Sequence, residues 1–386
     1  MSSRPPSIGI DARKLKDFGI GSYIRNLLEA MGRRPEAARY RFRVYARRAD
    51  RDAMPPLPGN FEVVEEDSPG YSLGELTRFA FRLFRDRLDL FHATHYVLPP
   101  LRSHAVVTIH DIIHLLYPQF LPNRAALVYA RVMIRRALRR ADRIITVSYN
   151  SKRDLVDYFG IVPSQVDVIY NGVSPEFRPD VSEGERDRVA RKYGLHRPYL
   201  LFLGGEKPHK NVQNVVRAFG EARRMRTDLP HVLALAGPMP KNPARIDALI
   251  SALDLSVAIA RPGRIEDEDL PGLFAGADAL LYPTLYEGFG LPVVEAMACG
   301  TPVLTSSTSA LQEIAGGYAY LVDPLDVDAI ARGILLLATD PKLRADFVEL
   351  GRKRALDFSW DKAAERTLEV YAEALAGKRE TGNGKR

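Results

Sequence analysis

Two glutamates, Glu287 and Glu295, flank a Gly-Phe-Gly-Leu-Pro run and are the residues of this 386-residue chain whose spacing first points to chemistry. Pro292 fits the first turn of a helix, where its missing N–H has no partner to lose. Gly288 and Gly290 let the backbone approach a ligand closely just before that helix begins. The unpaired N–H groups and positive dipole end of such a helix favour an anion such as a diphosphate. On local chemistry alone, a loop–helix connection with solvated glutamates explains the run equally well.

Other side chains that could take part in binding or catalysis follow predicted strands. His110 comes directly after a predicted strand at 105–109, and a basic loop with Lys207 and Lys210 follows another at 199–203. Ligands of parallel α/β sheets collect at the carboxyl ends of the strands, so these positions are candidates for a site. Histidines in polar turns also have purely structural roles, and for His110 both interpretations stay open.

A Gly-x-Gly run, Gly19 to Gly21, precedes a predicted helix at 23–31 whose expected N-cap is Ser22. A glycine loop that opens a helix again favours an anion or a substrate. The run lacks the third glycine of the dinucleotide fingerprint, which weakens that cofactor interpretation.

Alternating strands and helices in both halves of the chain must position these residues. The first half has predicted strands at 7–11, 40–46, 88–93, 105–109, 143–148 and 166–170 and further helices at 125–141 and 151–159. The second half has predicted strands at 199–203, 231–236, 256–260, 279–282, 302–305 and 318–322 and helices at 211–222, 269–274, 326–338 and 344–358. This alternation predicts an α/β protein with parallel sheets.

The polar stretch 177–191 is interpreted as the linker between two domains. We therefore expect a first domain at 1–180 and a second at 181–359, with a helix at 360–376 that returns to the first. The tail 377–386 is expected to be disordered. A cleft between two such domains is the usual place for a ligand.

The net charge of +7 is unevenly distributed. Residues 1–180 hold 28 Lys and Arg against 20 Asp and Glu, and the rest of the chain holds 27 against 28. The excess in the first half predicts an anionic partner, such as a membrane surface or a phosphorylated lipid. The predicted helix 125–141 carries Arg131, Arg135, Arg136, Arg139 and Arg140. Peripheral membrane contact and a solvated helix face both explain this helix.

Cys299 is the only cysteine, which excludes an internal disulfide framework and a cysteine-based metal cluster. It lies in an apolar run before a glycine, and we interpret it as a small core residue. No apolar run has the length of a bilayer span, and the N-terminus lacks the apolar core of a signal peptide. We expect a cytoplasmic protein, with the inner face of the plasma membrane as the place of any membrane contact.

The order of these motifs resembles glycosyltransferase family four, the retaining group with the GT-B architecture, and within it the mannosyltransferase-like bacterial group 1 enzymes. The matching segments are 19–21, 108–111, 168–173, 204–211, 287–303 and 358–360. A lone Glu-x7-Glu pattern is weak evidence, whereas the full run together with the other matches in order is strong. The resemblance implies two Rossmann-like domains that face each other across a cleft, the first for the acceptor and the second for the donor.

The resemblance implies metal-independent transfer of a hexose of the mannose, glucose or rhamnose class from a nucleotide diphosphate sugar, with retention at the anomeric carbon. The implied acceptor is a saccharide or a lipid-linked saccharide of cell-envelope polysaccharide biosynthesis. No cofactor and no divalent metal are implied. No protein nucleophile is assigned, and the carboxylate pair of retaining hydrolases is not projected onto these glutamates.

Three residues are implied to be catalytic. Lys210 would neutralise the donor diphosphate, Glu287 would hold sugar hydroxyls, and His110 would line the sugar pocket near the reacting carbon. Glu295 would bind the ribose hydroxyls, and Ile265 would lie beside the base. The other implied donor-binding positions are Gly19, Gly21, Gly205, Lys207, Gly290, Leu291 and Pro292.

One departure from the family concerns the basic loop. Many relatives carry arginine and lysine in tandem there, whereas this chain has His209 and Lys210. Since histidine is only partly charged near neutral pH, the diphosphate has two candidate arrangements. Either Lys207 acts with Lys210 in place of the usual arginine, or His209 is simply a surface loop residue, and whether His209 contacts the diphosphate stays open.

Two other functions compete with the transferase. A nucleotide-sugar epimerase or hydrolase of the same two-domain build would consume the donor without an acceptor. A basic nucleic-acid-binding protein is the alternative from another class, but the sequence has no basic motif interleaved with aromatic residues. The expected partners are therefore a nucleotide sugar and its acceptor, and not a nucleic acid.

Overall fold

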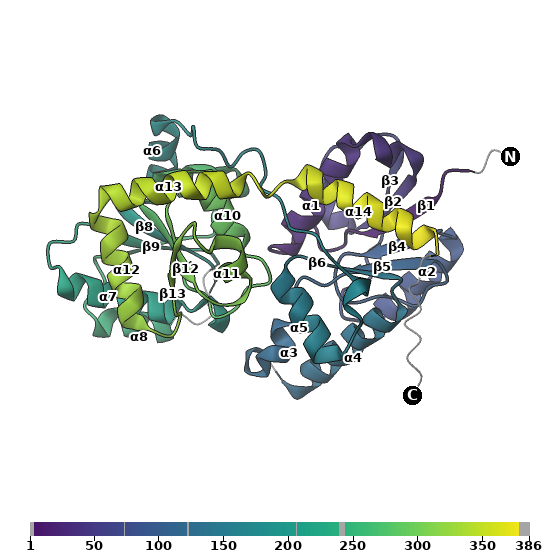
Figure 1. The fold of residues 1–386 in the computed structure, drawn as a ribbon, viewed down its shortest axis with the longest axis horizontal. Helices are drawn as coiled ribbons and strands as arrows, with labels where there is room; N and C mark the ends of the chain where they lie inside the picture. Colours follow the sequence, from purple (N-terminus) through teal and green to yellow (C-terminus); the bar gives the residue numbers. More distant parts are fainter. Residues whose placement is uncertain (1–3, 73, 122, 206, 239–243, 378–386) are drawn as a thin grey trace. The chain divides into compact units, whose positions relative to one another are not determined.

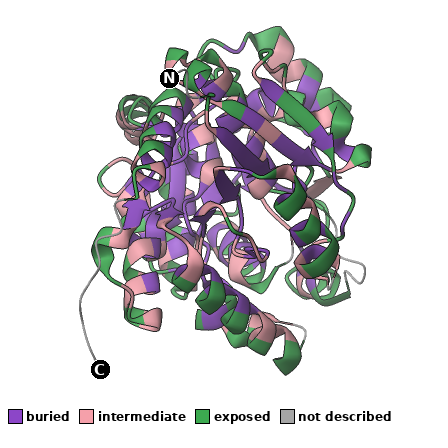
Figure 2. Ribbon diagram, turned by 90° about the vertical axis from the view of Figure 1, so that its right-hand side faces the viewer, coloured by how far each residue is buried: buried purple, intermediate pink, exposed green. Residues whose placement is uncertain are grey.

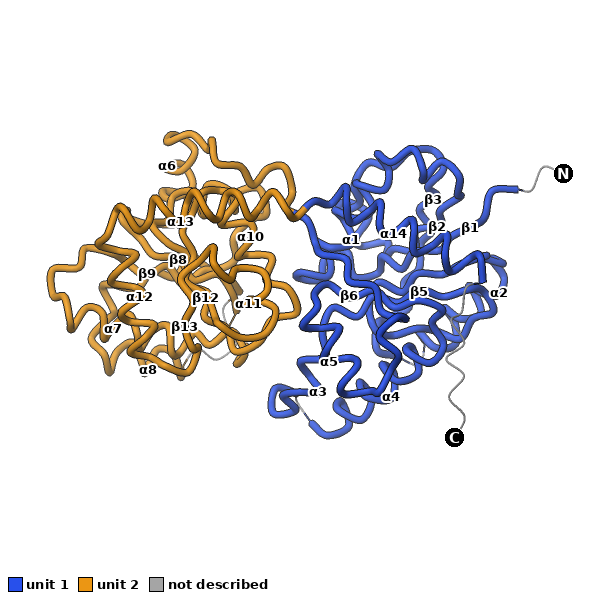
Figure 3. Tube along the Cα trace, viewed as in Figure 1, with its two compact units in different colours: residues 1–172, 359–386 blue, residues 173–358 orange. Residues whose placement is uncertain are grey.

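The computed structural model describes residues 4–72, 74–121, 123–205, 207–238 and 244–377. The chain forms two compact units: unit 1 is Met1–Gly172 with Ser359–Arg386, and unit 2 is Val173–Phe358 (Figure 3). The chain thus leaves unit 1 after Gly172, a few residues before the division at 180 that the sequence indicated. Apart from Gly377, the expected tail at 377–386 lies outside the described residues.

Unit 1 has a parallel sheet of seven strands among its described residues, in the order β3-β2-β1-β4-β5-β6-β7 (Figure 1). Its strands are β1 (Ser7–Asp11), β2 (Arg41–Ala46), β3 (Phe61–Glu65), β4 (Leu90–Ala93), β5 (His104–Thr108), β6 (Arg143–Thr146) and β7 (Val166–Val168). Its α-helices are α1 (Ile20–Arg33), α2 (Ala80–Asp86), α3 (Ile113–Leu116), α4 (Arg124–Arg140), α5 (Tyr149–Phe159) and α14 (Trp360–Leu375).

Unit 2 has a parallel sheet of six strands in the part that the structure describes, in the order β10-β9-β8-β11-β12-β13. Its strands are β8 (Tyr199–Leu203), β9 (Val232–Ala236), β10 (Ile259–Gly263), β11 (Ala279–Tyr282), β12 (Val303–Ser306) and β13 (Tyr320–Val322). Its α-helices are α6 (Glu183–Lys192), α7 (Val212–Met225), α8 (Ala244–Ala252), α9 (Leu270–Gly276), α10 (Leu291–Ala298), α11 (Ser309–Ala315), α12 (Val327–Thr339) and α13 (Pro341–Ala355).

The strands of unit 2 are apolar on both faces because helices cover both sides of the sheet. Along β8, Leu200 and Phe202 enter one core cluster, and Tyr199 and Leu201 enter the other. The inner strands of the two sheets are accordingly buried along most of their length, whereas the edge strands β3 and β10 are more exposed (Figure 2). Continuous apolar runs of this kind are typical of parallel sheets covered on both sides.

Each sheet reverses its strand order next to its first strand. In unit 1 this switch point lies between β1 and β4, and in unit 2 between β8 and β11. Loops that leave the carboxyl ends of two strands at a switch point diverge to opposite sides and leave room for a ligand. The loops after β1, β4, β8 and β11 are therefore the places where a site is expected.

Three local predictions were wrong. The strand predicted at 256–260 is β10, which begins at Ile259 and ends at Gly263. Helix α1 begins at Ile20 with Gly19 as its N-cap, so Ser22 lies inside the helix. The polar stretch interpreted as a linker contains helix α6, whose N-cap Ser182 accepts a hydrogen bond from the backbone N–H of Glu185. Only Val189 and Ala190 of α6 are buried, and so few apolar residues give no clear helical period.

Helix α14 belongs to unit 1 and packs against α1. Ser359 caps its start through the backbone N–H of Lys362. Further along the helix, the Tyr371 hydroxyl lies 2.6 Å from Nδ1 of buried His92, whose Nε2 lies 2.7 Å from Thr108 Oγ1. These bonds join the last helix of the chain to β4 and β5.

Candidate functional site

The Lys210 loop of unit 2 is held by hydrogen bonds to the segment that follows β11. Lys210 ends a 3-10 turn, η6 (Pro208–Lys210), which leads into α7. The next residue, Asn211, donates from Nδ2 to the carbonyls of Pro283 and Pro324, at 2.9 and 2.7 Å. The backbone N–H of Leu285 also donates to the carbonyl of His209 at 2.8 Å. The two loops at the β8–β11 switch point therefore form one connected body.

The Lys210 ammonium donates to two oxygens within this body. Its Nζ lies 2.6 Å from Tyr282 Oη and 2.8 Å from Glu287 Oε1. Burial works to lower the pKa of Lys210, but Glu287 and Tyr282 together outweigh it and the pKa rises. Burial, followed by the charge of Glu287, also raises the pKa of Tyr282. Lys210 is therefore a cation at neutral pH.

The third N–H of the Lys210 ammonium has no hydrogen-bond partner among the described residues. An ammonium group offers three donors, and Tyr282 and Glu287 take two of them. One donor is thus left for a further oxygen, such as a phosphate oxygen.

The segment after Glu287 turns sharply into α10. Gly290 is the N-cap, with φ 101° and ψ 52°, and a Cβ there would lie 2.5 Å from Leu311 Cδ2. Both the left-handed backbone and the close approach require glycine. Leu291 and Pro292 form the first turn of α10, as the sequence predicted. The backbone N–H groups of this turn lie on the same segment as Glu287.

Glu295 lies on α10, one turn after its start, and is partly buried. Burial is the main reason why its pKa is raised to about 8, and the charges of Glu176 and Asp267 raise it further. The Glu295 carboxyl is therefore largely protonated at pH 7, and a protonated carboxyl both donates and accepts a hydrogen bond. Glu295 and Glu287 thus differ in environment although both belong to one sequence motif.

The other predicted donor-binding residues of unit 2 lie in different settings. Lys207 is exposed, and Gly205 lies against Pro238. Ile265 is 6% exposed, and its side chain belongs to the core cluster that contains Leu273 and Tyr282. Because the Ile265 side chain is packed in the core, its backbone is the part that a ligand would reach.

His110 follows β5 in unit 1 and is partly buried. Its Nε2 donates to the carbonyl of Thr94 at 3.1 Å, and its ring meets Tyr23 edge-on at 4.8 Å. Burial lowers the pKa of His110 to about 4 although the bond to Thr94 opposes the shift. The imidazole is therefore neutral at pH 7, with Nδ1 as an acceptor.

The glycine loop after β1 is a tight turn of unit 1. Gly19 has φ 62°, and a Cβ on Gly21 would lie 2.3 Å from the carbonyl oxygen of Leu15. Backbone geometry therefore explains why glycine is found at both positions. The predicted site residues fall into two sets: His110, Gly19 and Gly21 in unit 1, and the remaining nine in unit 2.

A buried charged cluster at the β1–β4 switch point of unit 1 was missed by the sequence analysis. Arg13 donates to Asp11 through Nε and Nη2, at 2.9 and 2.6 Å, and to Glu75 Oε1 at 2.7 Å. Burial works to raise the pKa of Asp11, but Arg13 holds it below its usual value. The position of Asp11 at the end of a predicted strand is the signal that could have pointed to this cluster.

His95 completes the cluster, with Nε2 3.5 Å from Glu75 Oε1 and Nδ1 3.9 Å from Asp11 Oδ2. His95 is 2% exposed, and neither ring nitrogen has a hydrogen-bond partner among the described residues. The hydroxyl of nearby Tyr129 is likewise buried and without a partner in the described part of the chain. Tyr71 makes edge-on ring contacts with both His95 and Tyr129. Buried polar atoms in this state are satisfied by water or by a polar ligand.

Among the described residues, two groups of side chains resemble metal-binding sets. Asp11, Glu75 and His95 offer ligand atoms within 4.8 Å of one another, but the Arg13 guanidinium lies between the two carboxylates. The two carboxylates are therefore already paired with a cation, the Arg13 guanidinium. In the second group, Glu266, Glu268 and Asp269, the carboxylate of Asp269 is bonded by Arg188, Lys192 and Tyr193.

Comparison with known proteins identifies the family over both halves of the chain. Residues 19–177 match Glycosyltransferase Family 4, and residues 185–354 match the family described as Glycosyl transferases group 1. The O-antigen chain mannosyltransferase B of Escherichia coli is 31% identical over 294 residues, which are 76% of each protein.

Solved structures share the fold at low sequence identity. A sucrose-phosphate synthase from Thermosynechococcus elongatus has a TM-score of 0.77 at 21% identity, over 97% of this chain and 100% of that chain. Anabaena Alr3699/HepE in complex with UDP and glucose has a TM-score of 0.76 at 19% identity, over 95% and 100%. The GT-B fold and the family expected from the motifs are thereby confirmed. This chain is a glycosyltransferase that belongs to the group 1 enzymes of glycosyltransferase family 4.

Proposed function

We propose that the protein transfers a hexose from a nucleotide diphosphate sugar to a saccharide or lipid-linked saccharide acceptor, with retention at the anomeric carbon and without a divalent metal. The observation that carries the proposal is the Lys210 ammonium, which keeps one free donor while it binds Glu287, four residues before the start of α10. The similarity to an O-antigen chain mannosyltransferase supports mannose as the hexose and cell-surface polysaccharide synthesis as the setting. We propose that the transfer reaction takes place at a membrane surface, where a lipid-linked acceptor resides.

In this proposal, unit 2 supplies the positive charge and the N–H donors that stabilise a departing nucleoside diphosphate. In this proposal Lys210 and the first N–H groups of α10 stabilise the negative charge that develops on the diphosphate as the glycosidic bond breaks. Glu287, which is fixed by Lys210, accepts hydrogen bonds from sugar hydroxyls. The protonated Glu295 donates to one ribose hydroxyl and accepts from the other.

The residues of unit 1 provide neutral polar contacts. His110 is uncharged at pH 7 and presents Nδ1 as an acceptor for a sugar hydroxyl. The unpartnered ring nitrogens of His95 and the Tyr129 hydroxyl are suited to hydroxyls of an acceptor saccharide.

The proposal is tested by thermal shift with GDP-, UDP- and dTDP-sugars, followed by turnover with a candidate acceptor. One nucleotide sugar is expected to raise the melting temperature in a concentration-dependent way. Product from that donor is expected to keep the anomeric configuration, measured by NMR, and to form in the presence of EDTA. Donor consumption that needs no acceptor would point to an epimerase or hydrolase instead, and the absence of any stabilising nucleotide sugar would refute the transferase proposal.

A further inference from the structure

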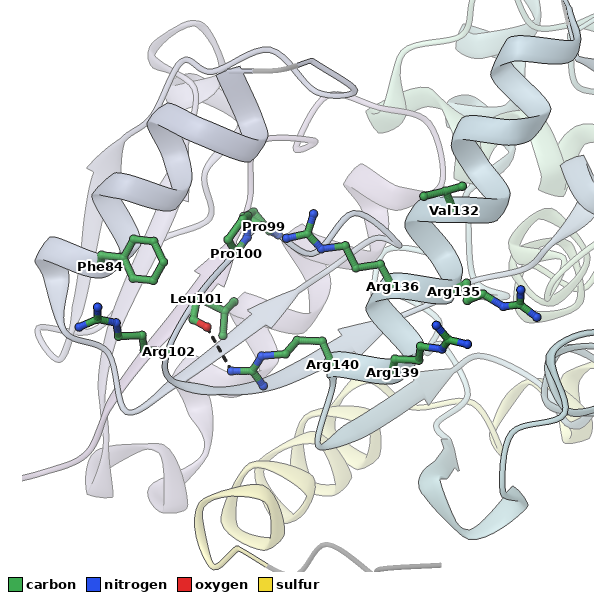
Figure 4. Close-up of a pocket in the computed structure, with 10 residues that line it drawn as sticks. All are labelled: Phe84, Pro99, Pro100, Leu101, Arg102, Val132, Arg135, Arg136, Arg139 and Arg140. Atoms are coloured by element: carbon green, nitrogen blue, oxygen red, sulfur yellow. Dashed lines mark hydrogen bonds between the residues drawn. The ribbon is translucent and has the colours of Figure 1, made fainter. Parts of the chain in front are cut away.

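Unit 1 carries a groove of about 690 Å³ on the side of α4 that faces α2 and the segment before β5 (Figure 4). The residues that line this arginine groove are Phe84, Pro99, Pro100, Leu101, Arg102, Val132, Arg135, Arg136, Arg139 and Arg140. Five of them are arginines and none is acidic. We propose that the arginine groove and the adjoining face of α4 dock the protein on an anionic lipid bilayer. The proposal rests on the proposed function for the presence of a lipid-linked acceptor and identifies the surface that reaches the membrane.

Helix α4 has one face for the core and one for an external partner. Its buried residues are Ala130, Met133, Ile134, Ala137 and Leu138. Arg131, Arg135, Arg136 and Arg139 are exposed, and the helix contains no acidic residue. Acidic residues at i,i+4 positions would pair with these arginines, and α4 has none, so its exposed face carries no compensating charge of its own.

The arginines of the groove divide into structural and available groups. Arg140 donates from Nη2 to the carbonyls of Leu101 and Ser103, at 3.2 and 2.8 Å, and so fixes one wall. Arg102 lies over the ring of Phe84 at 5.6 Å. The three others are Arg135, Arg136 and Arg139, which have no acidic partner in the part of the chain that the structure describes. Their guanidinium groups are therefore available for phosphate oxygens, which they bind through paired N–H donors.

The arginine side chains point in directions that allow them to contact a bilayer lying over the groove. Arg136 and Arg140 project toward the Pro99–Leu101 wall, whereas Arg135 and Arg139 point away from it (Figure 4). Positive groups thus line the groove and also extend beside it. A bilayer presents many phosphates at once, and a spread of arginines contacts several of them together.

Exposed apolar side chains accompany the arginines. Val128 is 60% exposed, Val132 51%, Phe81 71% and Phe84 41%. Both valines lie on α4 and both phenylalanines on α2, the two helices beside the groove. A polyanion in water gives these side chains no apolar partner, whereas the boundary between lipid headgroups and acyl chains does. The combination therefore favours a bilayer over a nucleic acid.

The groove lies at the opposite end of β5 from the candidate site. Leu101 and Arg102 come just before β5 begins at His104, and His110 follows the other end of that strand. Docking through the groove therefore leaves the carboxyl edge of the sheet uncovered. Membrane binding and donor binding are accordingly separable by mutation.

The test uses the full chain with the triple variant R135Q/R136Q/R139Q. Co-sedimentation is measured with vesicles of equal parts phosphatidylglycerol and phosphatidylcholine, and with vesicles of phosphatidylcholine alone. The unmodified protein is expected to bind the anionic vesicles only, and the variant is expected to bind them about 100-fold more weakly. High salt is expected to release the unmodified protein. Circular dichroism and donor-induced thermal shift are expected to be unchanged in the variant.

Two matched variants serve as controls. R135K/R136K/R139K keeps the charge and is expected to retain most of the vesicle binding. R39Q/R41Q/R48Q removes the same charge from exposed arginines elsewhere in unit 1 and is expected to bind like the unmodified protein. An equal loss in both glutamine variants would overturn the proposal because it would indicate a general charge effect.

Other outcomes decide the proposal as well. Failure of the unmodified protein to bind anionic vesicles would refute it, as would groove-dependent binding of an oligonucleotide without vesicle binding. Vesicle binding is measured without a nucleotide sugar. If no nucleotide sugar stabilised the protein while groove-dependent vesicle binding persisted, the proposed transfer reaction would fail and the docking surface would stand.

Discussion

The ammonium nitrogen of Lys210 lies 2.8 Å from a carboxylate oxygen of Glu287, although 77 positions separate the two residues. Both side chains are largely buried, at 19% and 13% exposure. Each therefore depends on the other: the carboxylate keeps the lysine charged, and the lysine fixes the direction of the carboxylate. A pair of this kind orients a charge before any ligand arrives, which is the condition for efficient electrostatic stabilisation.

Replacement of Lys210 by methionine tests this pair. Turnover is expected to fall by about 100- to 1000-fold because one preorganised donor to the leaving group is lost. The free energy of unfolding is expected to fall by about 1–3 kcal/mol because Glu287 and Tyr282 lose a partner. Both are measured, by donor turnover and by urea unfolding. Lys207→Met is the matched control at an exposed lysine, and a comparable loss of turnover there would assign the diphosphate contact to both lysines.

Glu295 is expected to make stability depend on pH. Its folded pKa of about 8 exceeds the unfolded value of about 4.3, so the folded protein holds a proton that the unfolded chain releases. The contribution of Glu295 to the free energy of unfolding is fully present below about pH 4. It declines as the pH rises toward 8, by at most about 1.4 kcal/mol per pH unit.

The variant Glu295→Gln isolates that contribution. The difference in melting temperature between variant and unmodified protein is expected to grow in favour of the variant from pH 5 to pH 8. A difference that stays constant over this range would show that the carboxyl is not held protonated. Glu295→Ala is expected to lose donor affinity, and full affinity in that variant would exclude a contact to the ribose.

Gly290→Ala is expected to destabilise unit 2 for two reasons. The residue would adopt φ 101°, and its Cβ would meet Leu311 Cδ2 at 2.5 Å. Gly317→Ala is the matched control, because Gly317 has φ 81° with no atom within 4 Å of the added Cβ. The control is expected to lose about 1 kcal/mol and Gly290→Ala clearly more, measured by thermal unfolding. Equal losses would mean that Leu311 moves aside without cost.

Arg13→Met is expected to cost about 3–5 kcal/mol at pH 7 because Asp11 and Glu75 become buried like charges. With Arg13 present, the lowered pKa of Asp11 contributes stability above its unfolded value of about 3.9, and this is lost as the pH falls through the folded pKa. In the variant the carboxyls take up protons at higher pH, so the deficit is expected to shrink between pH 7 and pH 5. Urea unfolding at both values checks this. Arg41→Met at an exposed site is expected to change little, and a deficit independent of pH would contradict the charge argument.

Apolar runs in the sequence determined the strands of the two sheets. Strands β8 and β11 lie at the residues that the sequence predicted, because each is a continuous apolar segment between polar or glycine-containing loops. Pro292 likewise predicted the start of α10, since proline is compatible only with the first turn of a helix. Such features depend on neighbours in the chain, and a sequence displays them directly.

Tertiary structure alone decided which charges meet. Tyr282 lies at the end of an apolar strand, and nothing in its local sequence connects it with Lys210. Arg13 and Glu75 are 62 positions apart and come together only in the folded unit, where Arg13 follows β1 and Glu75 lies between β3 and α2. The order of strands in a sheet follows from packing over the whole unit. The family and the candidate residues could therefore be read along the chain, whereas the protonation of Glu295 and the pairing of Lys210 required the fold.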